Sequence, residues 1–313
     1  MGTDANTVPE LGRDLSRRLW RHVPHDGFML SGQDPITGAG CFLTEEHGYG
    51  GEYFHRLQLD DVQGRSEQPF SRLIEGPVPI ATMNSGQPGF GDELRLALIH
   101  GGIAWGTLIL LRESGRPSFS ADELAHARQL VVPLALTVKA FVTRTAPRPR
   151  RSAAAPGVIV VGQDDRIKTA TPTGRDWLRA CVPYLDLPDD EALAITVWNL
   201  TFAARHGSGA ALSRIPAAEG WIGLRAQLLG DSGEVAITVQ AATAEVLLPA
   251  VAAWYGITRR ERSVVEQALE GAPAKQIARH LDLSPHTVND HFKAVYRKLG
   301  VHSREELVAV LSG

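Results

Sequence analysis

Apolar positions at helical spacing mark the C-terminal part of the chain. In residues 284–299 the apolar side chains fall on one face of a helix, and two shorter apolar series precede them. The series are Val264, Ala268 and Leu269; Ile277, Ala278 and Leu281; and Val288, Phe292, Val295 and Leu299. This pattern predicts short helices at roughly 258–270, 273–281, 284–299 and 303–311, of which the first three close one small core.

Helix start and stop signals support these boundaries. Thr258 precedes Glu261 by three residues, so each side chain can accept a hydrogen bond from the backbone N–H of the other. Ser284 followed by Pro285 is a further start signal. Proline has no backbone N–H, and in the first turn of a helix this N–H would have no partner within the helix. Ser303 with Glu306 is a similar start signal, and Gly271 and Gly300 are stop signals, because glycine commonly ends a helix.

The face opposite the apolar stripe of residues 284–299 is polar. Because each residue turns a helix by about 100°, this face carries His286, Asp290, Lys293 and Arg297, with Asn289 on its flank. A helix supported by two others and rich in hydrogen-bonding groups is suited to the DNA major groove.

Residues 257–311 also resemble the DNA-binding domain of the LuxR family, a tetrahelical helix-turn-helix. The family's opening LTxRE appears at 257–261, its eIAxxLxxSxxTVxxH at 276–291, and its KLGVxxRxEL at 298–307. The resemblance implies sequence-specific DNA binding as a homodimer. It also implies that the helix at 303–311 is the dimerisation surface, through Leu307, Val310 and Leu311.

Side-chain chemistry suggests roles on the polar face. We expect base-edge contacts from Asn289, Asp290 and Lys293, because Asn pairs with adenine, Asp accepts from cytosine and Lys donates to guanine. Contacts to phosphate are expected from Lys275, Thr287, His291 and Arg297.

Two of these positions depart from the common family pattern. Many members carry Lys where this chain has Asn289, and often an apolar or small residue where it has Asp290. Nonspecific affinity should fall, because it scales with the number of cations that meet phosphates. From Ile257 onward the chain holds nine Lys or Arg against seven Asp or Glu. An alternative stays open, in which the reader has a weakened affinity for DNA and binds another protein.

Residues 12–142 show a different order of elements. A helix is expected at 11–23, strands at 27–31 and 40–43, and a Gly101–Gly102 turn between strands at 92–100 and 104–112. Ser120 with Glu123 then begins a long helix to about residue 142. This order resembles a GAF domain, mainly over residues 101–123. Such domains bind a small molecule between sheet and helical lid, or only dimerise. Residues 1–11 are expected to be disordered.

Several side chains of this region could line a ligand pocket. The candidates are Phe28, Leu30, Tyr49, Tyr53 and Trp105, with Phe54 beside them, although aromatic residues at such spacing also form plain cores. A haem ligand would have to come from His47, His55, His100 or His126, and Cys41 is the one cysteine in this half. The cofactor is unknown, no Cys/His cluster has metal-ligand spacing, and no catalytic constellation argues for an enzyme.

A linker and a second small module follow. Residues 143–156, rich in Pro, Arg and Ala, are expected to be an exposed spacer. Its cluster Arg144, Arg148, Arg150 and Arg151 could instead touch DNA backbone. Residues 157–243 show strand, turn, strand, helices and a hairpin, an order that resembles a PAS-like module. Residues 244–254 are expected to form a helix that continues without a breaker into 255–313, either as a switching element or as a rigid spacer.

Composition limits the remaining choices. The net charge of −3 gives no bulk attraction to nucleic acid, so binding should depend on local charge and dimer geometry. Two cysteines, a polar N-terminus and the lack of a long apolar run favour a cytoplasmic protein without membrane contact.

The expected fold class is a multidomain α+β chain. It comprises a GAF-like α/β sensor, a small PAS-like α+β module and an all-α tetrahelical helix-turn-helix. The expected function is a homodimeric transcriptional regulator that binds a near-palindromic double-stranded DNA site. RNA polymerase and a small-molecule effector are the further partners considered.

Overall fold

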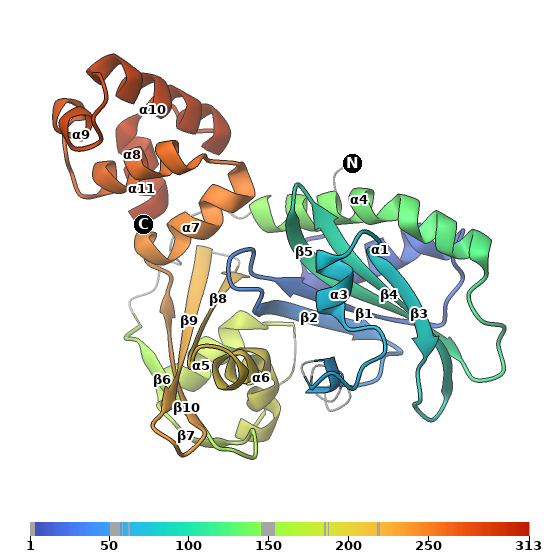
Figure 1. The fold of residues 1–313 in the computed structure, drawn as a ribbon. Helices are drawn as coiled ribbons and strands as arrows, with labels where there is room; N and C mark the ends of the chain where they lie inside the picture. The colour runs from blue at the N-terminus through green and yellow to red at the C-terminus, as the bar shows by residue number, and fades with distance from the viewer. Residues whose placement is uncertain are drawn as a thin grey trace.

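The computed structural model contains two modules built on sheets and one C-terminal helical domain (Figure 1). The structure describes residues 4–312 apart from 51–56, 58, 62, 145–153, 185, 187, 218 and 219. We call residues 4–144 the first module, 157–242 the second module and 257–312 the reader domain. The expectation of a multidomain α+β fold is confirmed.

The first module is built on one antiparallel sheet. Its strands are β1 (Gly27–Gln33), β2 (Gly40–Glu46), β3 (Ile80–Asn84), β4 (Phe90–His100) and β5 (Ile103–Glu113), in the spatial order β2-β1-β5-β4-β3. The β4–β5 turn uses Gly101 and Gly102 at φ of 62° and 75°, as the sequence predicted. Helices α1 (Val8–Trp20) and α4 (Ala121–Arg144) cover one face, and α3 (Phe70–Glu75) lies on the other.

Helix α1 begins earlier than expected. The Thr7 hydroxyl accepts from the Glu10 N–H at 3.3 Å, and the Glu10 carboxylate accepts from the Thr7 N–H at 3.3 Å. Ala5, Val8 and Leu11 are buried in the core of the module. The prediction of disorder up to residue 11 is therefore wrong from Ala5 onward, because a capping box precedes the apolar series. Residues 1–3 lie outside the described residues.

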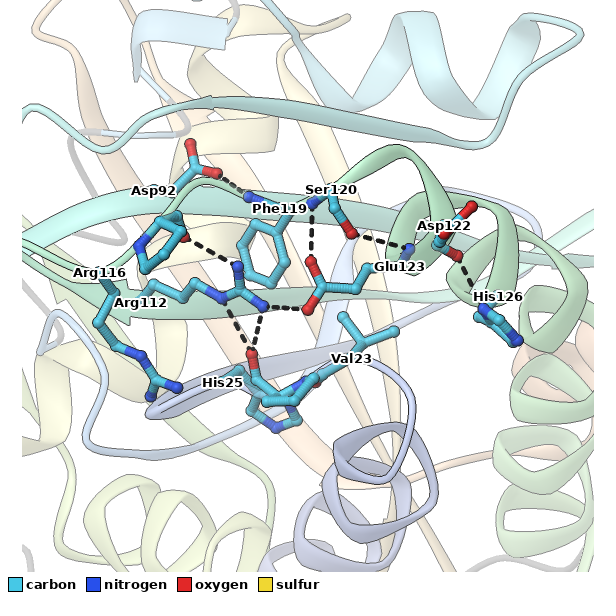
Figure 2. Close-up of polar contacts among 12 residues, drawn as sticks. Val23, His25, Asp92, Arg112, Arg116, Phe119, Ser120, Asp122, Glu123 and His126 are labelled. Carbon is cyan, nitrogen blue, oxygen red and sulfur yellow. Dashed lines mark hydrogen bonds and ion pairs between the residues drawn. The ribbon is translucent and has the colours of Figure 1, made fainter.

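The start of α4 is fixed onto β5 by one arginine (Figure 2). The Arg112 guanidinium donates to the Pro24 carbonyl and to the Glu123 carboxylate, and lies over the Phe119 ring at 4.1 Å from its centroid. The expected capping box is also present, because the Ser120 N–H donates to Glu123 Oε2 at 2.7 Å and the Glu123 N–H donates to Ser120 Oγ at 3.3 Å. Local sequence signals thus set where α4 begins.

The second module repeats the strand order of the first. Its strands are β6 (Gly157–Val161), β7 (Ile167–Ala170), β8 (Ala210–Ala217), β9 (Gly220–Leu229) and β10 (Glu234–Ala241), ordered β7-β6-β10-β9-β8. Helices α5 (Pro172–Cys181) and α6 (Asp190–His206) pack on this sheet. The sequence analysis did not assign β3 or β8. Both pair with a single neighbour at a sheet edge, where partner strands rather than alternation define the element.

Helix α7 (Ala244–Tyr255) connects the second module to the reader domain. Its position agrees with the predicted helix at 244–254, but the expectation of a continuous passage is wrong. Pro249 lies inside α7, and Gly256 at φ 65° ends it in the left-handed conformation. Leu247, Val251 and Trp254 are buried on α7.

The reader domain consists of α8 (Arg259–Leu269), α9 (Ala274–His280), α10 (Pro285–Leu299) and α11 (Arg304–Ser312). Each boundary lies within one residue of its prediction, and the predicted core positions Val264, Ala268, Ile277, Val288, Phe292 and Val295 are buried. The domain stands apart from both sheets, with α7 between (Figure 1).

Candidate nucleic-acid interface

A short turn sets the direction of α10 against α9. Asp282 adopts a φ of 53°, and the Leu283 N–H donates to the Ala278 carbonyl at 2.8 Å. The Ser284 hydroxyl then caps α10 by accepting from the Thr287 N–H at 3.1 Å. The predicted start signal at Ser284 is confirmed, and the turn leaves the first turns of α10 facing solvent.

The C-terminal end of α10 is fixed by a charged contact with α8. Lys298 Nζ donates to Glu261 Oε2 at 2.5 Å and to the Gly256 carbonyl at 2.8 Å. Glu261 also accepts from the Thr258 N–H at 2.7 Å, which completes the predicted capping box. Burial alone would raise the pKa of the Glu261 carboxyl, but the hydrogen bonds from Lys298 and Thr258 outweigh it and the pKa is lowered. The ionised carboxylate therefore holds α8 and α10 together.

The polar face of α10 is open to solvent. Its exposed side chains are His286, Asn289, Asp290, Lys293 and Arg297. The three base-reading candidates, Asn289, Asp290 and Lys293, thus lie together on one accessible surface. This arrangement matches what a major-groove helix requires, namely adjacent donors and acceptors on a rigid scaffold.

Asp290 makes two ion pairs along this face. Its carboxylate lies 3.0 Å from His286 Nδ1 and 3.5 Å from Lys293 Nζ. The side chains of Asp290 and Lys293 are 53% and 75% exposed, so water screens the attraction. Any base contact by Lys293 would therefore compete with a weak contact inside the same helix.

The phosphate candidates are placed less uniformly. Lys275 and Arg297 are exposed, whereas Thr287 and His291 are half-buried. The Thr287 hydroxyl is also 2.9 Å from the Ser284 hydroxyl, so it forms part of the helix cap. Sequence reasoning missed Arg279, which is exposed one turn after Lys275 on α9. The i, i+4 spacing of these two cations was the available signal.

The predicted dimerisation residues do not form a free surface. Leu307 and Leu311 have no exposed area, and Val310 is only partly exposed. Helix α11 packs on α7 and α8 within the chain, so its apolar face is already covered. In this arrangement α7 and α8 cover Leu307 and Leu311, so a dimer surface at these residues stays a prediction.

The described pocket candidates of the first module lie on both faces of its sheet. Phe28 and Leu30 face the core under α1 and α4. Trp105 joins the same core, because a register shift turns its ring toward Lys139 of α4, whose ammonium lies 5.4 Å from the ring centroid. Tyr49 lies on the opposite face of the sheet, and Tyr53 lies outside the described residues. Phe28, Leu30 and Trp105 are therefore core residues in this structure, and their role in a ligand pocket stays a prediction.

A buried ionic cluster on that opposite face was not predicted. The side chains of Glu93 and Arg95 are 0% and 1% exposed, and Arg95 Nε donates to Glu93 at 2.5 Å. Arg95 Nη1 donates to Asp61 at 3.1 Å, and the Tyr49 hydroxyl donates to Glu93 at 2.8 Å. Burial lowers the pKa of Arg95, but the two carboxylates outweigh it and the net shift is upward. Of the described pocket candidates, Tyr49 thus belongs to this cluster.

The remaining candidate groups, a cysteine and possible metal ligands, do not indicate a second site in the described part of the chain. Burial raises the pKa of the Cys41 thiol, which keeps it protonated. Among the residues that the structure describes, no group of three or more His, Cys, Asp or Glu is placed to hold a metal ion. Nor does any helix in that part of the chain have the length and apolar character needed to cross a membrane.

Comparison with known proteins supports the assignment of the reader domain. Residues 256–311 match the family of bacterial regulatory proteins, luxR family. A 55-residue stretch is 47% identical to an HTH-type transcriptional regulator of Mycobacterium tuberculosis, covering 18% of this chain and 6% of that protein. UhpA, a transcriptional regulatory protein of Escherichia coli, is 45% identical over 51 residues, covering 16% of this chain and 26% of UhpA. The chain therefore spans only a small part of these relatives.

Solved structures add little beyond the reader domain. The match to SdiA of Escherichia coli covers 98% of this chain and 90% of that chain, at 14% identity and a TM-score of 0.34. A GAF domain/HD domain protein from Geobacter sulfurreducens covers 44% of this chain and 95% of that chain, at 17% identity and a TM-score of 0.29. TM-scores this low do not assign the two modules built on sheets to a known fold. What is shown is that residues 256–311 form a LuxR-family helix-turn-helix domain.

Proposed function

We propose that this protein is a sequence-specific DNA-binding transcriptional regulator. The observation that carries the proposal is the exposed polar face of α10 on a domain that matches the LuxR family. Asn289, Asp290 and Lys293 read base edges, and Lys275, Arg279 and Arg297 contact phosphates. Thr287 and His291, which are half-buried, remain further candidates for phosphate contact.

The regulator acts as a homodimer on a near-palindromic site, as the family resemblance implies. A dimer contact through Leu307, Val310 and Leu311 would require α7 to move, because Leu307 and Leu311 are covered by the chain's own helices in the arrangement described here. The outward side of α11 offers Glu305, Ala309 and Ser312. Action in the cytoplasm and contact with RNA polymerase belong to the same proposal.

Selection of bound fragments from sheared genomic DNA tests this function. The intact protein should enrich a near-palindromic site, and Lys293→Ala should lose or relax that preference. Lys168→Ala is the matched control, since it removes the same charge from the second module. Failure of both the intact chain and an isolated 255–313 fragment to enrich any sequence at low salt would overturn the proposal.

A second candidate is a regulator that binds another protein through α10. The paired and exposed Asp290 favours it, since an anion in the centre of the face opposes phosphate contact. The same selection separates the two candidates, because a protein-binding face enriches no DNA site.

A further inference from the structure

A cleft of about 770 Å³ lies between the first and second modules. Its wall combines Ser31 and Thr107 from the first sheet, Phe70 from α3, and Asn199, Phe202 and Ala203 from α6. This volume falls within the range of roughly 300–1,000 Å³ that is typical of small-molecule sites. The cleft is distinct from the pocket that the sequence suggested, because neither Phe28, Leu30 nor Trp105 lines it.

The electrostatics of the cleft favour a neutral occupant. Two carboxylates line it, Asp34 and Asp61, and both are paired, with Arg214 at 2.6 Å and with Arg95 at 3.1 Å. Among the described lining residues there is no Lys or Arg to neutralise an anion. Apart from His206, the described lining residues offer a charged ligand no unpaired counter-charge, so such a ligand would lose its hydration with little compensation.

One polar group at the wall lacks a partner. Asn199 Oδ1 is buried and accepts no hydrogen bond in the described structure. A Cβ at position 40 would lie 2.5 Å from Asn199 Nδ2, so Gly40 allows the amide to sit against the first residue of β2. A buried acceptor without a donor is costly. Asn199 lines the cleft, and since the last torsion of Asn is broad, rotation of the amide is the way in which Oδ1 would meet a donor there.

We infer that this cleft is the effector site, and that it takes a neutral small molecule with an apolar body and one N–H or O–H donor for Asn199. The apolar part packs on Phe70, Phe202 and Ile103, which line the same wall. The regulatory role of this site rests on the proposed function, but binding of a small molecule in the cleft does not depend on DNA binding.

A continuous set of contacts leads from the cleft to the reader domain. Asp34 pairs with Arg214 of β8, and Arg214 Nε also donates to the Val246 carbonyl of α7. The Trp254 ring of α7 stacks on Trp221 of β9, with centroids 4.3 Å apart. Helix α7 in turn packs on α8 and α11. An occupant that moves the Asp34 loop thus moves the helix that covers the apolar face of α11.

The test uses two fluorescent probes on the full chain. N-phenyl-1-naphthylamine is neutral, apolar and carries one N–H, and its N-methyl analogue lacks the donor. The intact protein should bind the first probe saturably and the second about three- to tenfold more weakly, as expected for one hydrogen bond. Ala203→Trp fills the cleft and should weaken both probes by at least about tenfold, whereas Ala121→Trp, at an exposed position in the first turn of α4, should change neither.

Asn199→Leu decides the role of the amide. This variant should bind the two probes equally, because the hydrogen bond that separated them is gone. No saturable binding, or binding that Ala203→Trp leaves unchanged, would overturn the site. A preference for the N–H probe that persists in Asn199→Leu would overturn the donor assignment. DNA retention measured on the same samples tests the proposed function separately. A protein that binds the probes but no DNA would overturn the proposed function and leave the binding site in the cleft intact.

Discussion

Two aspartates of this chain pair with a cation in opposite surroundings. Asp34 and Arg214 are 0% and 3% exposed and join the first module to the second, whereas Asp290 and Lys293 are 53% and 75% exposed along α10. A buried charge depends on its partner, because it has lost its hydration. An exposed pair is worth less than about 1 kcal/mol and exchanges readily. The first pair therefore holds modules together, and the second leaves its groups available to DNA.

Breaking the buried pair should give the largest effect. Asp34→Ala leaves the Arg214 guanidinium buried without its carboxylate, so the free energy of unfolding should fall by about 3–5 kcal/mol in a urea titration. The double variant Asp34→Ala/Arg214→Met is the control and should recover most of that loss. A single variant that loses less than about 1 kcal/mol would show that the junction is not held by this pair.

The contact between α8 and α10 should rank second. Glu261→Gln removes the charged cap and the Lys298 ion pair, and should cost about 2–3 kcal/mol of reader-domain stability. Glu266→Gln, which breaks an exposed pair with Arg262 on the same helix, should cost less than about 0.5 kcal/mol. Equal losses in the two variants would contradict the account.

The same contact predicts a pH dependence. The pKa of Glu261 is lowered in the folded chain, so the unfolded chain binds the proton more tightly. The stability that Glu261 adds over Gln is therefore complete above its ordinary pKa of 4.5 and is lost as the pH falls below it. Unfolding midpoints of both proteins between neutral pH and pH 3 should converge at the acid end.

Lys293→Ala should reduce affinity for the selected DNA site about tenfold, or roughly 1.4 kcal/mol, because one base contact is lost. Its unfolding midpoint should not change, since the side chain is exposed. Fluorescence anisotropy with labelled DNA measures the affinity, and Lys168→Ala again controls for the loss of one positive charge. An equal loss in the control would assign the effect to net charge.

Asp290→Asn should have the smallest effect and the opposite sign. Removing this anion should strengthen binding to random DNA by a few-fold and steepen its salt dependence, because Lys293 is freed for phosphates. Asp176→Asn, at an exposed position of the second module, should leave both quantities unchanged. Weaker random binding by Asp290→Asn would mean that the pair with Lys293 positions the reader.

The sequence predicted the reader domain well because its signals are local. Thr258 with Glu261 and Ser284 with Pro285 act within one turn, so spacing alone gives the helix boundaries. The errors concern contacts that spacing does not encode. Alternation places Phe28 and Trp105 in a sheet but does not say which face of the sheet becomes a pocket. A register shift between β4 and β5 then places the Trp105 side chain on the face opposite to the one that alternation predicts.

Long-range contacts were the other limit. Leu307 and Leu311 have the pattern of an interface helix, but α7 covers them from within the chain. Asp34 and Arg214 are separated by 180 positions, and Arg214 lies on a strand that the pattern did not show. The cleft between the modules depends on the same long-range packing, so no single stretch of sequence could indicate it.

The most direct test of the reader is a binding profile over every single-base variant of the selected site, for the intact protein and for Lys293→Ala. The account predicts that the variant loses discrimination at one position in each half-site and keeps it elsewhere. A uniform loss of affinity, with every base preference unchanged, would contradict base reading by α10 and leave Lys293 as a phosphate contact.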